Sequence, residues 1–326
     1  NKMIESNLKK NLLIWSKIGL RAAFGLSLIE LKKKYKNFFV VSADVSTSAG
    51  LDRFRKTYPD NYIDVGIAEQ NLIGIATGLA NENYKVITTT FGPFQTLRCC
   101  EQIKVNLGYM KNKIIMVGLA SGLALGSLGF THASIEEIGV LRSIPNITII
   151  SPADCLELAK ALEGAIKHNN SCYIRLTGSS NNPIVYEKDY EFQIGKSIEL
   201  KKGNDGVLIC NGPLVYNCLE AAKLLIKDNI NISVIDMHTI KPIDKDMILK
   251  KMKESEIIFT AEEHNIIGGL GSAVAEVMSS EKNNCKLVRL GINDVYTKGG
   301  SQNYLQHLNG LSIEKIVNTV KTSLGN

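Results

Sequence analysis

Short runs of β-branched and aromatic residues alternate with longer segments of helical periodicity along most of the chain. Strands that alternate with helices form a mostly parallel sheet covered on both faces, so the first half predicts a doubly wound α/β domain. The expected strands are 38–41, 62–65, 85–90, 114–117, 147–150 and 172–176. The expected helices are 12–34, 97–110, 135–141 and 155–167, with another that begins near Glu69.

The alternating pattern breaks between Thr177 and Gln193, where Gly, Ser, Asn, Pro and charged residues gather, as they do in linkers. A second α/β pattern follows, with strands expected at 206–210, 232–236, 257–261 and 287–290 and helices at 215–227, 247–253, 271–280 and 312–323. The sequence therefore predicts two doubly wound α/β domains, a first at 1–180 and a smaller one at 195–326, joined by a linker at 181–194.

The composition is that of a globular protein of 326 residues, with 44% hydrophobic and 21% charged residues. The net charge of +6 comes from lysines in short, scattered groups with few aromatic residues near them. That pattern favours a solvated surface over a nucleic-acid stripe. The seven cysteines form no C-x-x-C pair, and no secretory signal is apparent at the N-terminus. We therefore expect a cytoplasmic protein with reduced thiols and no membrane partner.

One acidic residue, Glu69, stands inside a run of apolar and small residues at 65–78. Ile67, Leu72, Ile75, Ala76 and Leu79 recur there at helical spacing and are expected to bury one face. A carboxylate in such a place loses water, which favours its protonated form and suits acid–base catalysis. A helix-capping or exposed Glu69 is the structural alternative.

Several motifs in this order resemble the C-terminal portion of transketolase-like, thiamine-diphosphate-dependent enzymes, and above all the split transketolases, where that portion is a separate chain. The motifs extend over nearly the whole chain. They are Ser-Ala-Asp at 42–44, Gly-Ile-Ala-Glu-Gln-Asn at 66–71, Phe-x-x-Phe-x-x-x-Arg-x-x-Glu-Gln at 91–102, Gly-x-Thr-His at 129–132, Leu-Arg-x-Ile-Pro-Asn at 141–146, Arg175, Lys-Pro-Ile-Asp at 241–244 and Glu-Glu-His-Asn…Gly-Gly-x-Gly at 262–271.

The resemblance implies that the first domain is a pyrimidine-binding domain. Glu69 matches the glutamate that contacts ring nitrogen N1′ of the aminopyrimidine, where protonation drives the 4′-amino group toward the form that deprotonates the thiazolium carbon. Phe91 and Phe94 match aromatics that pack on the pyrimidine ring. Asp44 matches an acidic residue close to the cofactor. Arg98 is assigned to the cofactor site, with a subunit-interface pair between Arg98 and Glu101 as the alternative.

The resemblance also assigns the substrate end of the site. His132 matches a histidine that reaches the sugar and serves as a hydrogen-bond donor or proton carrier. Arg21, Ser48 and Arg175 match positions that hold a sugar phosphate.

The sugar end departs from the family pattern at three positions. Leu128 stands where ordinary transketolases carry an acidic residue, and Phe130 replaces a smaller one. Ala120 occupies a position where a phosphate contact is expected. Because a lost hydrogen-bond partner changes discrimination steeply, the substrate is not expected to be a standard pentose phosphate.

A second polypeptide is expected to complete the site. The chain has no Gly-Asp-Gly followed by Asn at the family spacing, and it has no cluster of oxygen ligands for Mg²⁺. The resemblance therefore implies a partner N-terminal subunit that holds Mg²⁺ and the diphosphate, in an α2β2 heterotetramer.

The expected function is transfer of a two-carbon ketol unit from a ketose, phosphorylated or otherwise activated, to an aldose. Three alternatives stay open: the beta subunit of a 2-oxo acid dehydrogenase decarboxylase, a carboligase like deoxyxylulose-phosphate synthase, and a non-catalytic subunit. The Gly-Phe-Thr-His loop and Arg175 favour the ketol transferase over the decarboxylase, because a decarboxylase pocket needs no phosphate clamp.

Overall fold

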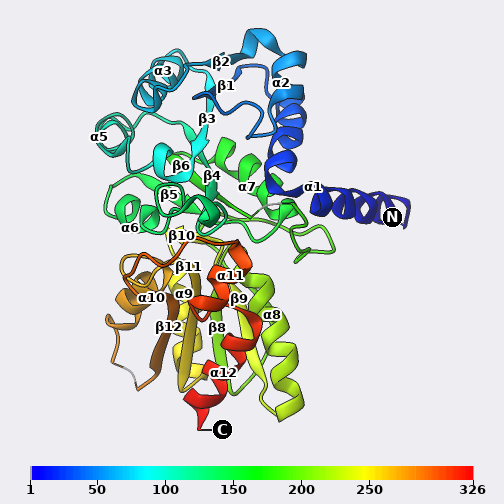
Figure 1. The fold of residues 1–326 in the computed structure, drawn as a ribbon, viewed down its shortest axis with the longest axis vertical. Helices are drawn as coiled ribbons and strands as arrows, with labels where there is room; N and C mark the ends of the chain where they lie inside the picture. Colours follow the sequence, from blue (N-terminus) through cyan, green and yellow to red (C-terminus); the bar gives the residue numbers. More distant parts are fainter. Residues whose placement is uncertain (1, 179, 283, 326) are drawn as a thin grey trace.

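The computed structural model describes residues 2–178, 180–282 and 284–325, with side chains from residue 11 onward. Two α/β domains are stacked end to end, the first in blue to green and the second in yellow-green to red (Figure 1). Both contain mostly parallel sheets, as the sequence predicts.

In the described chain, seven strands form the sheet of the first domain, in the order β10-β5-β6-β4-β3-β1-β2. All neighbouring pairs are parallel except β10 with β5. Strands β3, β4, β5 and β6 are buried almost throughout, as parallel strands between two helical layers should be. The strands are β1 (Phe38–Ser42), β2 (Tyr62–Asp64), β3 (Lys85–Phe91), β4 (Ile115–Ser121), β5 (Ile147–Ile150), β6 (Ser171–Thr177) and β10 (Thr239–Lys241).

The helices of the first domain include short ones that the sequence analysis did not anticipate. The helix expected at 97–110 is instead a short α-helix followed by a π-helix, η2 (Ile103–Tyr109). The α-helices are α1 (Lys2–Lys34), α2 (Asp52–Thr57), α3 (Glu69–Asn81), α4 (Gly92–Gln95), α5 (Cys100–Gln102), α6 (Glu137–Arg142) and α7 (Cys155–Lys167). The 3₁₀ turns are η1 (Pro59–Asn61) and η3 (Gly126–Leu128).

Helix α1 is kinked at Gly19, whose φ of 80° lies outside the helical region. By length and composition alone, its segment Asn11–Lys34 meets the criteria for a membrane span, and 44% of the tested window is buried inside the protein. Beyond the kink, Leu20, Phe24 and Leu28 pack in the core of the first domain. This part of α1 is therefore a core helix. Before the kink Leu12 is still buried and Ser16 donates to the Asn182 carbonyl, and only the N-terminal end of the helix projects from the body (Figure 1).

In the described chain, five strands form the sheet of the second domain, in the order β12-β11-β8-β9-β7. Only the edge strand β7 is antiparallel to its neighbour. The strands are β7 (Ile198–Lys201), β8 (Gly206–Cys210), β9 (Ile232–Asp236), β11 (Ile257–Asn265) and β12 (Lys286–Ile292). The helices are α8 (Leu214–Leu225), η4 (Ile226–Asp228), α9 (Lys245–Glu254), α10 (Leu270–Met278), α11 (Gln302–Leu308) and α12 (Ile313–Leu324).

The two domains are joined by more than the linker. Strand β10 belongs to the second half of the sequence but pairs with β5 of the first sheet. Tyr186 and Tyr190 of the linker stack at 4.1 Å between ring centroids. Their hydroxyl groups donate to buried carboxylates, Tyr186 to Asp236 at 2.7 Å and Tyr190 to Glu157 at 2.9 Å. Two tyrosine hydroxyl groups thus hold the linker by hydrogen bonds to one buried carboxylate from each domain.

Candidate active site

The candidate site lies at the carboxyl edge of the first sheet, between β1 and β3. The connections from these two strands run in opposite directions across the sheet, so this is a topological switch point, where open α/β sheets bind ligands. The exposed Asp44 comes just after β1, and Phe91 ends β3. The Ala43 N–H donates to the Thr89 carbonyl at 3.3 Å and ties the two strand ends together.

Three rings form a cluster at this edge. The ring centroids of Phe91 and Phe94 are 6.1 Å apart, and that of His132 lies 5.4 Å from Phe94 and 6.3 Å from Phe91, all edge-to-face. Pro93 is the second residue of the short helix α4, which starts directly after Phe91, and its fixed φ favours the turn that places Phe94 near the first ring. The structure therefore brings together three residues that the sequence assigned to the cofactor and the sugar.

Glu69 and Arg98 extend this cluster. The Arg98 guanidinium lies over the Phe94 ring at 4.0 Å from its centroid, and its Nη1 donates to Glu69 Oε1 at 2.6 Å. The Glu69 side chain is 7% exposed and that of Arg98 is 44% exposed. Arg98 thus connects the nearly buried Glu69 carboxylate to the aromatic cluster, and the more exposed arginine lies between the carboxylate and solvent. Burial, with a Coulombic contribution from Glu69, also raises the pKa of the Cys99 thiol to about 12.

Glu69 owes its position to the turn that precedes α3. It is the first residue of that helix, where the partial positive charge of the helix N-terminus attracts a carboxylate. Asp64 Oδ1 accepts from the Asp44 N–H at 3.0 Å and from the Gly66 N–H at 2.9 Å, and Gly66 has a φ of +72°. Asp64 therefore links the loop after β1 to the turn before Glu69. The sequence analysis missed it, although an acidic residue at a strand end two positions before a glycine could have signalled such a turn.

The buried face of α3 differs from the predicted one. Leu72, Ile73, Ala76 and Thr77 are buried, whereas Ile67 is 80% exposed. Ile67 was wrongly assigned to the buried face, because it lies before the first turn of α3. Glu69, the first residue of that helix, is buried instead.

His132 lies on a loop that the second domain supports. The Gly122–Ser134 bridge closes the base of the loop, and the Leu123 N–H donates to Glu263 Oε2 at 3.1 Å. The half-buried His132 shares a hydrogen bond between its Nδ1 and the Thr131 Oγ1 at 3.0 Å. Leu128 on this loop is 57% exposed. The ring centroid of Phe130 lies 5.2 Å from that of Tyr296 in the second domain.

Arg21 and Ser48 lie together at the surface near the end of β1. Arg21 Nη1 donates to the Ser48 carbonyl at 3.4 Å. Gly25 and Gly50 permit this approach of α1 to the loop, because a Cβ on Gly25 would lie 2.0 Å from the Gly50 oxygen. The Ser48 hydroxyl and the Arg21 guanidinium have the chemistry of an anion contact, and their role stays a prediction.

Arg175 does not fit the predicted phosphate-binding role. Its side chain is 0% exposed, and its Nε donates to Glu137 at 2.5 Å. Nη2 donates to the carbonyls of Ser134 and Glu263. Because Arg175 lies in the middle of the central strand β6 and is paired inside the protein, we correct its assignment to a structural ion pair. Ala120 is likewise buried near the end of β4, with 2% exposure.

His264 is held by the protein's own backbone. Its Nδ1 bonds the Asn265 carbonyl at 2.7 Å, and its Nε2 accepts from the Gly139 N–H at 3.3 Å. Burial lowers the pKa of His264, which keeps the ring neutral. Within the described residues, no group of three or more His, Cys, Asp and Glu side chains is arranged to hold a metal ion.

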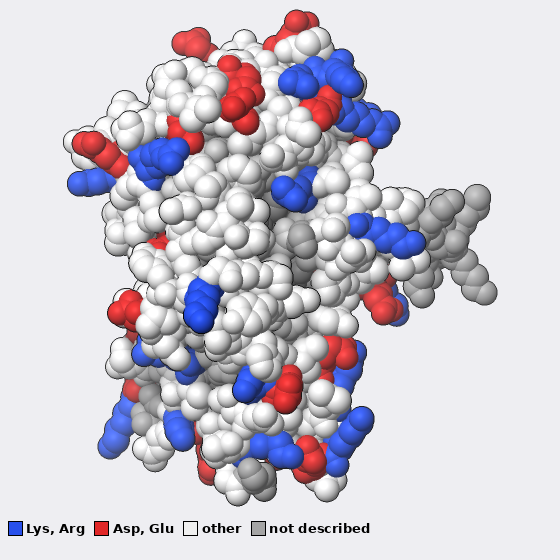
Figure 2. Space-filling view, viewed as in Figure 1, with Lys and Arg blue, Asp and Glu red and all other residues white. Residues whose placement is uncertain are grey.

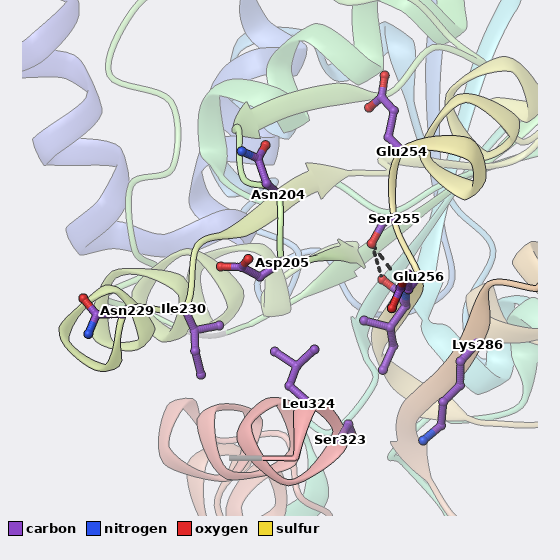
Figure 3. A pocket seen from close by; sticks show the side chains of 11 residues that line it. Asn204, Asp205, Asn229, Ile230, Glu254, Ser255, Glu256, Lys286, Ser323 and Leu324 are labelled. Atoms are coloured by element: carbon purple, nitrogen blue, oxygen red, sulfur yellow. Dashed lines mark hydrogen bonds between the residues drawn. The ribbon is translucent and has the colours of Figure 1, made fainter.

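A cavity of about 710 Å³ lies far from this cluster, at the amino edge of the second sheet. Asp205, Glu254 and Glu256 contribute carboxylates, and the C-terminal end of α12 contributes Ser323 and Leu324 (Figure 3). Lys286 also lines this cavity, opposite in charge to the carboxylates. It shares no residue with the ring cluster and is not part of the candidate site.

The charged side chains on the face shown in Figure 2 are spread over both domains, with Lys and Arg next to Asp and Glu. No broad surface of one sign is seen on this face, which agrees with the solvated surface that the sequence predicts.

Two doubly wound domains, with a buried glutamate and aromatic rings at the switch point of the first, define the pyrimidine-binding portion of a transketolase-type enzyme. The family comparisons agree. Residues 16–182 match the model of the transketolase pyrimidine binding domain, and residues 195–316 match that of the transketolase C-terminal domain. The chain belongs to the transketolase family.

The relatives include separate-chain proteins of similar length. The chain is 37% identical to the putative transketolase C-terminal section of Methanocaldococcus jannaschii, over 93% of this chain and 95% of that protein. It is 35% identical to a subunit of the apulose-4-phosphate transketolase of Phocaeicola vulgatus, over 93% of this chain and 96% of that protein. A solved structure described as a split gene transketolase, inactive beta4 tetramer, superposes with a TM-score of 0.85 at 34% identity, covering 94% of this chain and 98% of that one.

Proposed function

We propose that the chain is the pyrimidine-binding subunit of a two-chain transketolase, which transfers a two-carbon ketol unit from a ketose to an aldose. The observation that carries this proposal is the nearly buried Glu69 carboxylate, which pairs with Arg98 over the Phe94 ring, while that ring contacts His132. Similarity to the separate-chain relatives supports the two-chain arrangement.

The residues at the switch point fit the aminopyrimidine of thiamine diphosphate. A flat heteroaromatic ring needs an aromatic face to pack on, which Phe91 and Phe94 offer, and a hydrogen-bond donor at its ring nitrogen, which a protonated Glu69 offers. When bound, the cofactor supplies a carbon nucleophile and an electron sink for the cleaved ketose. Asp44 at the end of β1 borders the same edge.

The chain's own residues have separate tasks in this proposal. Glu69 holds a proton at its carboxyl oxygen and shares it with the ring nitrogen, and the nearly buried site keeps water from competing. For that, Glu69 must exchange its Arg98 partner for the ring, while Arg98 stays on the Phe94 face. His132 is accessible at the edge of the cluster and donates to the sugar oxygens. Arg21 and Ser48 hold the far end of a phosphorylated substrate.

We further propose that a partner subunit holds Mg²⁺ and the diphosphate, and that two chains of each kind form an α2β2 heterotetramer. The structural relative that forms a tetramer of one chain type is described as inactive, which supports the need for a partner. The seven scattered cysteines, which form no C-x-x-C pair in the sequence, support a reducing, cytoplasmic location.

A calorimetric titration tests the division of the site. We expect little binding of Mg²⁺ and thiamine diphosphate to this chain alone, and binding when the partner subunit is added. Tight binding by the chain alone contradicts the proposal.

Coupled assays test the reaction itself. The reconstituted pair is expected to consume a ketose phosphate with an aldose acceptor, and to leave a branched 2-oxo acid or pyruvate unreacted. The opposite preference identifies a decarboxylase or a carboligase. Because Arg175 is buried in an ion pair, it no longer favours the ketol transferase over the decarboxylase. The choice between these reactions therefore depends on the assay.

A further inference from the structure

The loop that carries His132 packs on the second domain. Its base is closed by the backbone bridge between Gly122 and Ser134. The ring of Phe130, near the middle of the loop, packs against a small apolar core that both domains build. The buried members of this core come from the two ends of the loop and from the second domain: Leu123, Ile135, Ile292 and Leu305.

Glu263, near the end of β11, makes a polar contact to the same loop. Its side chain is buried, with 0% exposure, and its Oε2 accepts from the Leu123 N–H at 3.1 Å. Gln302 Nε2 donates to Oε1 at 2.8 Å and to Oε2 at 3.1 Å, and Gln306 Nε2 donates to Oε1 at 2.5 Å. The two glutamines are one turn apart on α11, so both reach the same carboxylate. Helix α11 thus holds the carboxylate in place against the loop.

Consecutive turns connect this contact to His132. The Leu123 carbonyl accepts from the Gly126 N–H at 2.9 Å, and the Gly126 carbonyl accepts from the Gly129 N–H at 3.0 Å. The Gly129 carbonyl then accepts from the His132 N–H at 3.1 Å. Each of these hydrogen-bonded turns restricts the backbone between its two ends. A displacement at Leu123 is therefore expected to reach His132.

The second domain holds the loop at Gly126 as well. The Gly300 N–H donates to the Gly126 carbonyl at 3.0 Å. A Cβ on Gly126 would lie 2.1 Å from Leu305 Cδ1 and 3.0 Å from the Gly300 oxygen, so the two backbones approach as closely as only glycine permits. The loop therefore has little freedom to shift relative to α11.

We propose that Glu263 is a positioning residue for the sugar end of the site, which acts through Leu123 to fix the loop that presents the His132 ring beside Phe94. The ring centroids of His132 and Phe94 are 5.4 Å apart, so a shift of the loop changes this contact directly. The inference rests on the proposed function, in which His132 donates to the sugar oxygens. It gives the second domain a specific part in that function, the placement of a substrate-binding side chain on the first domain.

The first experiment measures the position of His132 without any activity. In the full chain with ¹³C-labelled histidine, the ring resonances of His132 are assigned by their loss in His132→Asn. In Glu263→Ala they should move toward the values of free histidine, because the ring leaves the field of the Phe94 ring. Glu262→Ala is the matched control. Glu262 is the adjacent residue of β11, is equally buried, and accepts from the first backbone N–H groups of α10, so its loss should leave the His132 resonances in place.

The second experiment uses the reconstituted pair. Glu263→Ala should lower kcat/KM for a ketose phosphate roughly tenfold to a hundredfold, the loss expected when a substrate-binding group is misplaced, and should leave the cofactor dissociation constant unchanged. In a His132→Ala background the same change should cost little more, because the effect passes through His132. Glu263→Gln keeps an oxygen for the Leu123 N–H and should recover most of the loss. Glu262→Ala should have the same effect in both backgrounds.

A milder pair of variants covers the case in which Glu263→Ala does not fold. Gln302→Ala removes one donor to Glu263 from a half-buried position and should shift the His132 resonances in the same direction by less, while Asn303→Ala, at the exposed next position, should not. The proposal is overturned by His132 resonances that stay unmoved in Glu263→Ala or in Gln302→Ala. It is also overturned by equal shifts in Glu262→Ala, or by effects of Glu263→Ala and His132→Ala on kcat/KM that are fully additive. A wild-type pair without ketol transfer would refute the proposed function, whereas the resonances decide independently whether Glu263 places the loop.

Discussion

The carboxylate of Glu69 and the guanidinium of Arg98 form an ion pair at 2.6 Å, although 29 positions separate them in the chain. Gln70 strengthens the same junction, because its Nε2 donates to the Arg98 carbonyl at 3.1 Å. The start of α3 is therefore fastened to the segment that carries Phe94 by two contacts.

The first prediction concerns Glu69 itself. Glu69→Gln and Glu69→Ala in the reconstituted pair should lower kcat roughly a hundredfold to ten-thousandfold, because the proton at the ring nitrogen is lost. Light scattering should show the assembly intact. Glu82→Gln, at the exposed opposite end of α3, is the control and should keep full turnover. Unchanged turnover in both Glu69 variants would support a non-catalytic subunit.

The second prediction concerns Arg98. Arg98→Ala removes a charged hydrogen bond and the cation over the Phe94 ring, so it should raise the apparent dissociation constant of the cofactor about tenfold. Isothermal titration of the reconstituted pair measures this value. Arg55→Ala removes an exposed ion pair with Asp52 and should have no effect. Tighter cofactor binding in Arg98→Ala would instead show that the ion pair competes with the ring.

The third prediction concerns the sugar phosphate. Arg21→Ala should raise the KM of a phosphorylated substrate about tenfold to a hundredfold, because one charge-assisted hydrogen bond is lost. The kcat should change little, and the KM of a non-phosphorylated aldose should stay the same. Arg53→Ala, an exposed arginine of α2, serves as the control. Equal effects on both substrates would remove Arg21 from the phosphate site.

The fourth prediction concerns Arg175. Arg175→Ala should lower the free energy of unfolding by about 3 kcal/mol or more, because the Glu137 carboxylate is left buried and unpaired. Urea unfolding measures this change. Replacing both partners, as in Arg175→Met with Glu137→Gln, should be milder. Lys34→Met removes an exposed pair with Glu163 and should cost little. A stable Arg175→Ala protein with a raised substrate KM would restore the phosphate-binding assignment.

The fifth prediction concerns the buried carboxylates at the linker. Burial raises the pKa of Asp236 to about 7 and also raises the pKa of Glu157, so both hold protons more tightly in the folded state. The stability that Asp236 contributes is fully present below the ordinary carboxyl pKa. It is lost as the pH rises from about 4 to about 7, by up to about 1.4 kcal/mol per pH unit.

Thermal unfolding of Asp236→Asn checks this sign. The amide mimics the protonated acid and can still accept from the Tyr186 hydroxyl group. The difference between the Tm of the variant and that of the wild type should therefore shift in favour of the variant as the pH rises through this range. Asp228→Asn, whose exposed carboxylate pairs with Lys321, should show no such trend. A constant difference for Asp236→Asn across the pH range would contradict the prediction.

Most strands of both domains could be predicted because they are short, apolar and bounded by turn residues. Strands β7 and β10 were missed. Strand β10 has only three residues, and its partner is β5, about ninety positions away in the sequence. The π-helix η2 was also missed, since its side chains follow a helical pattern that does not distinguish one hydrogen-bond spacing from another.

The sequence by itself predicted the two α/β domains and identified Glu69, Phe91, Phe94 and His132 as candidate site residues. Both predictions were possible because hydrophobic periodicity and ordered motifs are local properties of the chain. Only the tertiary structure decided which polar side chains face solvent and which face each other. Arg175 became a buried ion pair because Glu137 packs against β6 in the fold. Asp64 links the loop after β1 to the turn before α3, because the fold brings the backbone N–H groups of Asp44 and Gly66 to its carboxylate. Partners that lie far apart in the sequence leave no local trace, and burial depends on all the elements packed around a residue.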